Sequence, residues 1–298
     1  MKKFLSLALA VIMLVCCLSA CSSATEGVKV IDIKLTDEEY AFAVQKGDAE
    51  LLQQLNDFMA EIKENGKFDE IINKYFQGGQ PTAVKSASTM KTDGTQLIVA
   101  TNAAFEPFEY MVGENYYGVD MEIMSLFAEK LGKELYIYNM EFDAVCLSVS
   151  AAGGTYTDEN GKEVTQAGGV CDIAAAGLTV SDERKEILDF STSYYQASQM
   201  LIVPESCEDF DECKTVEDVE SILKTFGKDV KVGVQKGTTG QLYCEGDESW
   251  GFDGFGFTTV SYTNGALAVQ DILNQNCGYV IIDEGPAKAI VTNVNAAN

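Results

Sequence analysis

Along this chain, short runs rich in β-branched residues alternate with segments whose apolar residues recur at helical spacing. This alternation is typical of α/β folds, in which helices connect the strands of a sheet and cover its faces. We expect strands at 28–33, 40–45, 97–101, 135–139, 173–176, 200–203, 230–234 and 279–283. The chain has 298 residues, of which 46% are hydrophobic, and this suffices for two domains with separate cores.

Three helices are indicated by apolar residues that fall on one face. The clearest covers 48–64, where Asp48 can cap the first turn and Gly66 can end the helix. A short amphipathic helix follows within 68–76, and another is expected over 119–131.

Two stretches lack a regular pattern. Residues 77–96 are rich in Gly, Ser, Thr and Gln and are typical of a flexible linker. Residues 153–169 are polar and Gly-rich, so we expect an exposed excursion there.

The first 21 residues are typical of an export signal. Lys2 and Lys3 precede an apolar run over 4–18, which is shorter than the ~20 residues needed to span a membrane. The run ends in Leu-Ser-Ala-Cys at Cys21, which resembles the lipobox of bacterial lipoproteins. The resemblance implies that 1–20 are removed and that Cys21 is lipidated, so that the protein is anchored at the extracytoplasmic membrane face. Ordinary cleavage that leaves a free thiol is the alternative.

Cysteines are numerous beyond this segment. An even number of them in an exported chain favours disulfides, although the pairing stays open. The six are Cys146, Cys171, Cys207, Cys213, Cys244 and Cys277. Zinc is the alternative, but the chain has no CxxC pair and no histidine for the usual site, so we expect no metal.

Charge and histidine content exclude several function classes. The chain has 21 Lys+Arg against 46 Asp+Glu, which leaves no basic surface for nucleic acid. It has no histidine, which excludes Ser-His-Asp and Cys-His triads and the HExxH zinc site. A binding protein is favoured over an enzyme, and no catalytic residue or cofactor motif stands out.

Several ordered motifs resemble one known family. They are LIVATNAAFEPFEY at 97–110, GVDMEI at 118–123, CDIAAAGLTVSDERKEILDFS at 171–191, KVGVQKGTT at 231–239 and VIIDE at 280–284. With these motifs the chain resembles the solute-binding proteins of polar amino-acid ABC importers, extracellular solute-binding protein family 3. The resemblance implies a two-lobed periplasmic-binding-protein-like α/β fold with two hinge crossings.

The order of the segments departs from that family. The segment 36–79 resembles the family's usual C-terminal end, but here it precedes the family's usual first strand, and no equivalent follows 280–284. A circular permutation accounts for this order, with 77–96 joining the old ends; an accessory N-terminal domain on a truncated protein is the alternative. The permutation implies the following division of the chain: tether 21–27, a lobe 2 or hinge strand 28–35, lobe 1 over 36–199, and lobe 2 over 200–298.

The resemblance also implies how the polar ends of an amino acid would be held. Arg184 is the only arginine in the chain, and a guanidinium is the best partner for a carboxylate. By resemblance, Gly177, Thr179 and Thr239 would complete the cradle, and Asp283 would bind the ammonium group.

The side-chain pocket is implied by the same motifs. Phe105 matches an aromatic residue that stacks over the ligand, and Phe142 would form the opposite wall. Asn102 stands where many relatives that bind basic side chains carry aspartate, which favours a neutral polar ligand. Gln235 is a further candidate for a polar wall.

We therefore expect a binding protein that closes about its hinge on a free polar L-amino acid and delivers it to an ABC permease. Two alternatives remain. One is a ligand-sensing receptor or adaptor with the same fold, and the other is an exported dehydratase-like enzyme.

Overall fold

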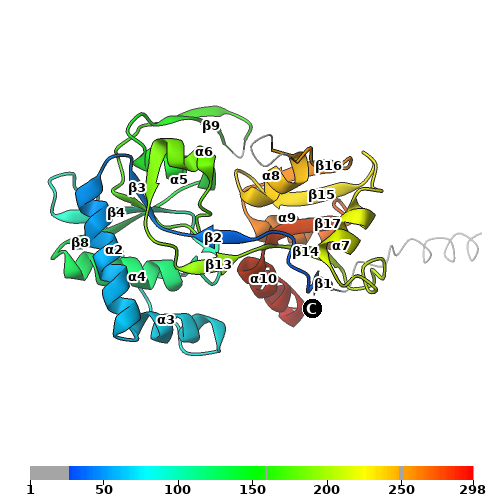
Figure 1. Ribbon diagram of the computed structural model, residues 1–298, viewed down its shortest axis with the longest axis horizontal. Helices are drawn as coiled ribbons and strands as arrows, with labels where there is room; N and C mark the ends of the chain where they lie inside the picture. Colours follow the sequence, from blue (N-terminus) through cyan, green and yellow to red (C-terminus); the bar gives the residue numbers. More distant parts are fainter. Residues whose placement is uncertain (1–26, 159, 248–251, 298) are drawn as a thin grey trace, which may run out of the picture.

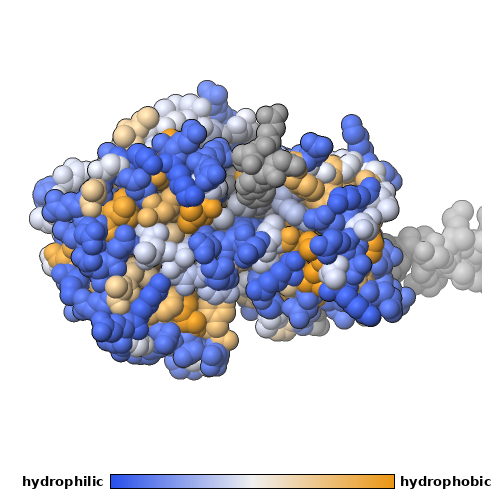
Figure 2. Space-filling model, in the orientation of Figure 1, coloured by the Kyte–Doolittle hydropathy of each residue, from blue (hydrophilic) through white to orange (hydrophobic). Residues whose placement is uncertain are grey.

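Two five-stranded sheets form the centres of two lobes, which two short strands connect (Figure 1). The structure is a computed structural model that describes residues 27–158, 160–247 and 252–297. The expected signal peptide 1–20, the lipidation site Cys21 and nearly all of the tether 21–27 lie outside the described residues. Hydrophilic side chains cover most of the face seen in Figure 2.

Lobe 1 is built on a sheet in the order β12-β3-β11-β4-β8, in which β4 runs parallel to β8 and β11, and β3 is antiparallel. Its strands are β3 (Ala43–Gln45), β4 (Gln96–Thr101), β8 (Glu134–Asn139), β11 (Ile173–Ala174) and β12 (Leu188–Phe190). Its helices are α2 (Ala49–Glu64), α3 (Lys67–Phe76), α4 (Val119–Lys130), α5 (Phe142–Val149) and α6 (Asp182–Ile187). Two smaller sheets complete it: β5 (Ala104–Phe105) with β6 (Glu109–Val112) and β7 (Asn115–Tyr117), and β9 (Gly154–Thr157) with β10 (Glu163–Gln166).

Lobe 2 is built on a sheet in the order β1-β14-β17-β15-β16. Its strands are β1 (Val28–Ile31), β14 (Gln199–Pro204), β15 (Lys231–Gln235), β16 (Thr258–Tyr262) and β17 (Tyr279–Asp283). Its helices are α7 (Val216–Leu223), α8 (Thr239–Glu245), α9 (Gly265–Leu273) and α10 (Glu284–Ala297).

The chain crosses between the two lobes twice. Strand β2 (Glu38–Tyr40) pairs antiparallel with β13 (Tyr195–Ala197), and both run across the waist of the molecule (Figure 1). The first crossing connects β1 in lobe 2 to β3 in lobe 1, and the second connects β12 in lobe 1 to β14 in lobe 2. The predicted α/β fold with two hinge crossings is confirmed.

Two local predictions differ from the structure. Residues 40–45 form two strands rather than one, because the chain leaves β13 after Tyr40 and begins to pair with β12 at Ala43. The polar excursion at 153–169 is a β-hairpin, since β9 and β10 pair residue by residue.

The disulfide prediction is wrong for this structure. All six cysteines are free among the described residues, and Cys171, Cys244 and Cys277 are buried. The Cys277 thiol lies 3.0 Å from the Tyr279 carbonyl oxygen, to which it donates a hydrogen bond. An even count therefore carries no information on which thiols approach one another.

The segment 36–79 is built into lobe 1. Strand β3 lies between β11 and β12, inside the sheet. At the far end of the segment, the Glu122 carboxylate on α4 accepts hydrogen bonds from Lys74 Nζ at 2.6 Å, Tyr75 Oη at 2.6 Å and the backbone N–H of Thr82 at 3.2 Å. The buried Glu122 carboxylate thus connects α3 and the linker that follows it to α4 of lobe 1.

Replacing Glu122 by alanine should destabilise the protein by about 3 kcal/mol, because it leaves a largely buried lysine and a tyrosine hydroxyl without their acceptor. The measurement is the urea midpoint of unfolding. Glu70→Ala is the control, since it removes an exposed, solvent-screened ion pair with Lys67 and should leave the urea midpoint nearly unchanged. Equal losses of stability in the two variants would contradict a special role of Glu122 in holding α3 and the linker.

Candidate functional site

A small cavity of about 10 Å³ lies between the two lobes. It is lined by residues from the ends of strands and the starts of helices in both lobes. Those from lobe 1 are Phe105, Phe142, Gly177, Thr179 and Arg184, and those from lobe 2 are Thr238, Thr239 and Asp283. The structure therefore brings seven of the predicted site residues together, and adds Thr238.

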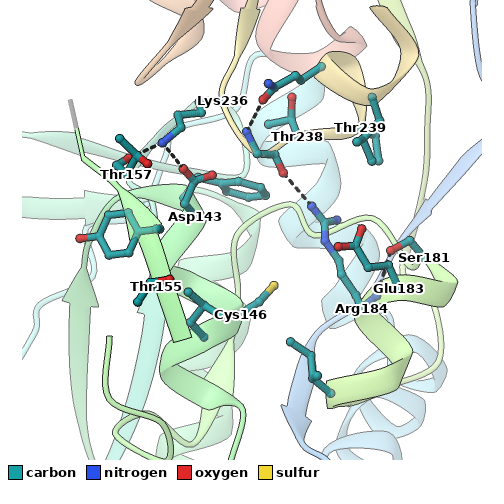
Figure 3. Close-up of a pocket in the computed structure, with 17 residues that line it drawn as sticks. Asp143, Cys146, Thr155, Thr157, Ser181, Glu183, Arg184, Lys236, Thr238 and Thr239 are labelled. Atoms are coloured by element: carbon teal, nitrogen blue, oxygen red, sulfur yellow. Dashed lines mark hydrogen bonds and ion pairs between the residues drawn. The ribbon is translucent and has the colours of Figure 1, made fainter. Parts of the chain in front are cut away.

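Arg184 joins the lobes at this cavity. It lies in the first turn of α6, where the Ser181 side chain caps the helix by accepting the Arg184 N–H at 3.2 Å. The guanidinium donates to the Thr179 carbonyl at 2.8 Å. It also donates to the Gly237 carbonyl of lobe 2 at 3.2 Å (Figure 3). It also lies 5.5 Å from the centre of the Phe142 ring, a cation–π distance.

The charge of Arg184 is not neutralised within the described parts of the chain. Every ion pair found there involves a lysine, and none involves Arg184. In a protein with 46 acidic residues, this lone guanidinium at the lobe interface is suited to an anion from outside.

Glu38 is a central residue of this arrangement and was not predicted from the sequence as a site residue. It lies on the crossing strand β2 and is 7% exposed. Its Oε2 accepts hydrogen bonds from the hydroxyls of Thr179 in lobe 1 and Thr239 in lobe 2, each at 2.7 Å. Its Oε1 accepts from the Thr36 hydroxyl at 2.6 Å and from Gln199 Nε2 at 3.1 Å. The Glu38 carboxylate therefore holds both lobes through their threonines.

Asp283 is the second buried carboxylate of the site. It ends β17, is 4% exposed and accepts a hydrogen bond from the Tyr40 hydroxyl. Burial raises its pKa to about 7, and the nearby Glu38 carboxylate adds to this rise. The acid is therefore poised between its neutral and charged forms near neutral pH.

A further acidic pair supports the Gly177 loop from behind. The Gly177 N–H donates to Asp120 at 3.0 Å, and the Tyr194 hydroxyl donates to the same carboxyl group at 2.6 Å. Burial raises the pKa of Asp120 to about 7. The pKa of the adjacent Glu109 is also raised, first by burial and then by the charge of Asp120. Only glycine fits at 177, because its φ is +50° and a Cβ would lie 2.7 Å from the Phe105 ring.

Two predicted residues do not line the small cavity in this conformation. Gln235 Nε2 donates across the lobes to Asn102 Oδ1 at 3.2 Å, and Asn102 Nδ2 donates to the Met140 carbonyl at 2.7 Å. The two amides thus bind each other and close that side of the site.

A second and much larger pocket of about 450 Å³ adjoins the cavity. It lies between α5, β9 and α6 of lobe 1 and the start of α8 in lobe 2 (Figure 3). At its rim, Lys236 of lobe 2 forms a 2.7 Å ion pair with Asp143 of lobe 1 and donates to the Thr157 carbonyl on the hairpin.

The family follows from comparison with known sequences. The profile of the bacterial extracellular solute-binding proteins, family 3, matches residues 11–78, 97–153 and 157–275. The chain belongs to this family. The predicted resemblance is confirmed, and the family is an extracytoplasmic one.

Individual relatives carry amino-acid-binding names. The chain is 30% identical over 158 residues to the arginine-binding extracellular protein ArtP of Bacillus subtilis, covering 53% of this chain and 51% of that protein. It is 27% identical over 166 residues to a probable histidine-binding protein of Neisseria gonorrhoeae, covering 55% and 51%. The chain thus spans about half the length of these curated relatives.

A solved structure shows the same fold. An ancestral arginine-binding protein bound to arginine matches with a TM-score of 0.52 at 27% identity, over 67% of this chain and 74% of that one. Among the described helices, none is both long and apolar enough to cross a membrane.

Proposed function

We propose that this protein binds a free α-amino acid between its two lobes, by hinge closure and without catalysis. The observation that carries the proposal is Arg184, which forms no ion pair with any residue that the structure describes, on one side of an interlobe cavity that has Asp283 on the other. A guanidinium suits the α-carboxylate, and an ionised aspartate suits the ammonium group. Thr179, Thr239 and the Gly177 loop line the rest of the cavity, and the names of the relatives support this ligand class.

The preferred side chain in this proposal is neutral and polar. The amides of Asn102 and Gln235 meet between the lobes and carry no charge, whereas a cationic side chain would call for a carboxylate there. On opening, each amide has both a donor and an acceptor to offer. Phe105, which is buried beside Gly177, supplies the aromatic surface.

The proposal has two further parts. Delivery of the amino acid to an ABC permease rests on the family. Anchoring through lipidated Cys21 rests on the sequence of the export signal. A ligand-sensing receptor would close on its ligand in the same way. Uptake of labelled ligand by cells with and without the protein separates transport from sensing.

The test is thermal unfolding of the soluble form that begins at Ser22, against the twenty amino acids. A ligand at 100 times its Kd should stabilise the fold by about 2.7 kcal/mol, which is a clear rise in Tm. One or a few polar amino acids should produce this rise. A flat response to all twenty would refute the proposal.

Binding should depend on pH through Asp283. The folded protein keeps a proton on Asp283 up to about pH 7, and this proton must leave before the carboxylate can accept an ammonium group. Below pH 7 the Kd should therefore rise by about tenfold for each pH unit, and above it the Kd should level off. Titration calorimetry at pH 5–8.5 checks this, and at pH 6 it should show release of a proton to the buffer. Asp283→Asn should bind weakly with no such slope.

The same pKa has a consequence for stability. The group's pKa is higher in the folded state than its ordinary value of 3.8, so between about pH 4 and 7 the native state holds a proton that the unfolded chain has lost. The stability contributed by Asp283 is therefore greatest at low pH and falls as the pH rises to about 7. A contribution that rises over this window would contradict the direction of the shift.

We also propose that the order of segments arose by circular permutation. The start of β1 and the end of α10 lie together in lobe 2, where Asn295 Nδ2 donates to the Val28 carbonyl at 2.8 Å (Figure 1). The segment 77–96 runs along lobe 1, where Val84 exchanges backbone hydrogen bonds with Tyr116. In this proposal lobe 1 comprises 36–199, lobe 2 comprises 200–298 with 28–35, and the lipid tethers lobe 2.

A further inference from the structure

The 450 Å³ pocket adjoins the proposed amino-acid site. Phe142, Arg184, Thr238 and Thr239 line both the pocket and the small cavity, so these four side chains form the partition between them. The two spaces differ greatly in size. A cavity of about 10 Å³ has room for about one water molecule, whereas 450 Å³ lies within the range of small-molecule sites.

The walls of the pocket are largely apolar. The apolar lining comes from three elements of lobe 1 and from α8 of lobe 2, and it consists of Phe142, Cys146, Leu147, Tyr156, Ile187 and Leu242. Ile187 keeps 39% of its surface exposed, although it is a large apolar side chain beside this space. An apolar group in the pocket would cover it.

Two cations mark the upper rim of the pocket. In Figure 3, Lys236 lies at the upper edge of the space and reaches down to Asp143 and Thr157, whereas Arg184 lies on the opposite side with its guanidinium directed upward. Lys236 is held by Asp143 and the Thr157 carbonyl, whereas Arg184 donates to the Thr179 and Gly237 carbonyls and forms no ion pair with a described residue. The carboxylates of Asp143 and Glu183 also line the pocket, so an anionic group at this rim would bind Arg184 and would compete with Asp143 for Lys236.

The orientation of a bound amino acid in the small cavity determines which of its ends lies next to the larger pocket. Asp283 lines only the small cavity, while Arg184 lines both spaces. With the ammonium group at Asp283 and the carboxyl group at Arg184, the carboxyl end points to the pocket. A group attached through the carboxyl carbon therefore enters the space between β9 and α8.

We propose that this pocket is a second subsite that accepts the apolar C-terminal residue of a dipeptide. The N-terminal residue of the dipeptide occupies the amino-acid site, the peptide carbonyl accepts from Arg184, and the terminal carboxylate lies at the rim with Lys236. The hairpin β9–β10 supplies one wall, so this excursion enlarges the range of ligands. The inference rests on the proposed function for the position of the ammonium group.

The test compares ligands and pocket variants by titration calorimetry. The ligands are the amino acid that most raises the Tm, the dipeptide of that residue with C-terminal leucine, and the same dipeptide with C-terminal aspartate. The leucine dipeptide should bind about tenfold more tightly than the amino acid, and the aspartate dipeptide should lose this gain.

Two variants fill the pocket from different walls. Thr155→Trp acts from an exposed position on β9, and Ile187→Trp acts from the exposed end of α6. Each should weaken the leucine dipeptide by at least about tenfold while changing the Kd of the free amino acid less than about twofold. Thr155→Ser is the matched control and should leave both ligands unchanged.

The outcomes separate the two proposals. If the free amino acid binds and the leucine dipeptide does not, the subsite is refuted and the proposed function stands. If the dipeptide binds equally well to both tryptophan variants, it lies elsewhere and the subsite is refuted. If the aspartate dipeptide matches the leucine one, the apolar class is wrong. If neither the amino acid nor a dipeptide binds, the proposed function fails and the subsite fails with it.

Discussion

Arg184→Ala should weaken amino-acid binding by about 100-fold or more, a loss of about 2.7 kcal/mol. The ligand's carboxylate would lose its only arginine partner and would remain desolvated between the lobes. The closed form would also lose the hydrogen bond from Arg184 to Gly237, which joins lobe 1 to lobe 2. The measurement is the Kd of the amino acid by titration calorimetry. Arg184→Lys should recover only part of the affinity, because an ammonium group cannot form two parallel hydrogen bonds.

The matched control for this variant is Lys185→Ala. Lys185 is the next residue of α6, and its exposed side chain pairs with Asp182 one turn earlier. Removing it takes away the same unit of positive charge at nearly the same place, so it tests whether net charge alone is responsible. Its Kd should stay within about twofold of the parent protein. A comparable loss in both variants would show that Arg184 is not the carboxylate partner.

Glu38→Ala should both destabilise the protein and open the lobes of its ligand-free form. The change removes an acceptor used by two threonine hydroxyls from opposite lobes and by two further donors. Hydrogen bonds to a buried charge are worth more than neutral ones, so we expect a loss of about 3 kcal/mol in unfolding free energy. Removing Glu38 also relieves its repulsion of Asp283, which offsets part of the loss at neutral pH. The loss should therefore be clearest near pH 6, where Asp283 is largely protonated.

Opening is measured by X-ray scattering. The ligand-free Glu38→Ala protein should have a larger radius of gyration than the parent, and saturating ligand should reduce the difference. Glu39→Ala is the control, because Glu39 is exposed on the same strand and, among the described residues, its side chain accepts a hydrogen bond only from Gln196 of the paired strand. An unchanged radius with unchanged stability in Glu38→Ala would show that this carboxylate does not hold the lobes together.

The β-branched runs that alternate with helical segments predict the strands of the two sheets well, because a buried strand is marked by the apolar residues of its own short segment. They do not predict where a strand changes partner. The split of 40–45 into β2 and β3 depends on the pairing of Tyr40 with Tyr195 and of Ala43 with Phe190, and these contacts are far apart in sequence. The hairpin over 154–166 was equally hard to predict, since both of its strands are polar and mostly exposed.

The site was predictable where a motif or a scarce residue marked it. Arg184 stood out as the only arginine, and the motifs placed Thr179, Thr239 and Asp283 together. Glu38 carried one usable signal: it lies two residues before Tyr40, so the two share a face of the strand and are both buried. The relation of the small cavity to the larger pocket could not be predicted, because it depends on how α8 of lobe 2 meets the hairpin of lobe 1.

Recognition of the α-amino and α-carboxyl groups is measured most directly by the Kd of three compounds for the soluble protein. They are the amino acid that stabilises it most, the N-acetyl derivative of that amino acid, and the amine that lacks its carboxyl group. If Asp283 and Arg184 hold the two charged groups, the amino acid should bind at a ratio of one per chain, and each derivative should bind at least about 30-fold more weakly. Equal affinities for all three would contradict recognition of the α-amino and α-carboxyl groups by Asp283 and Arg184.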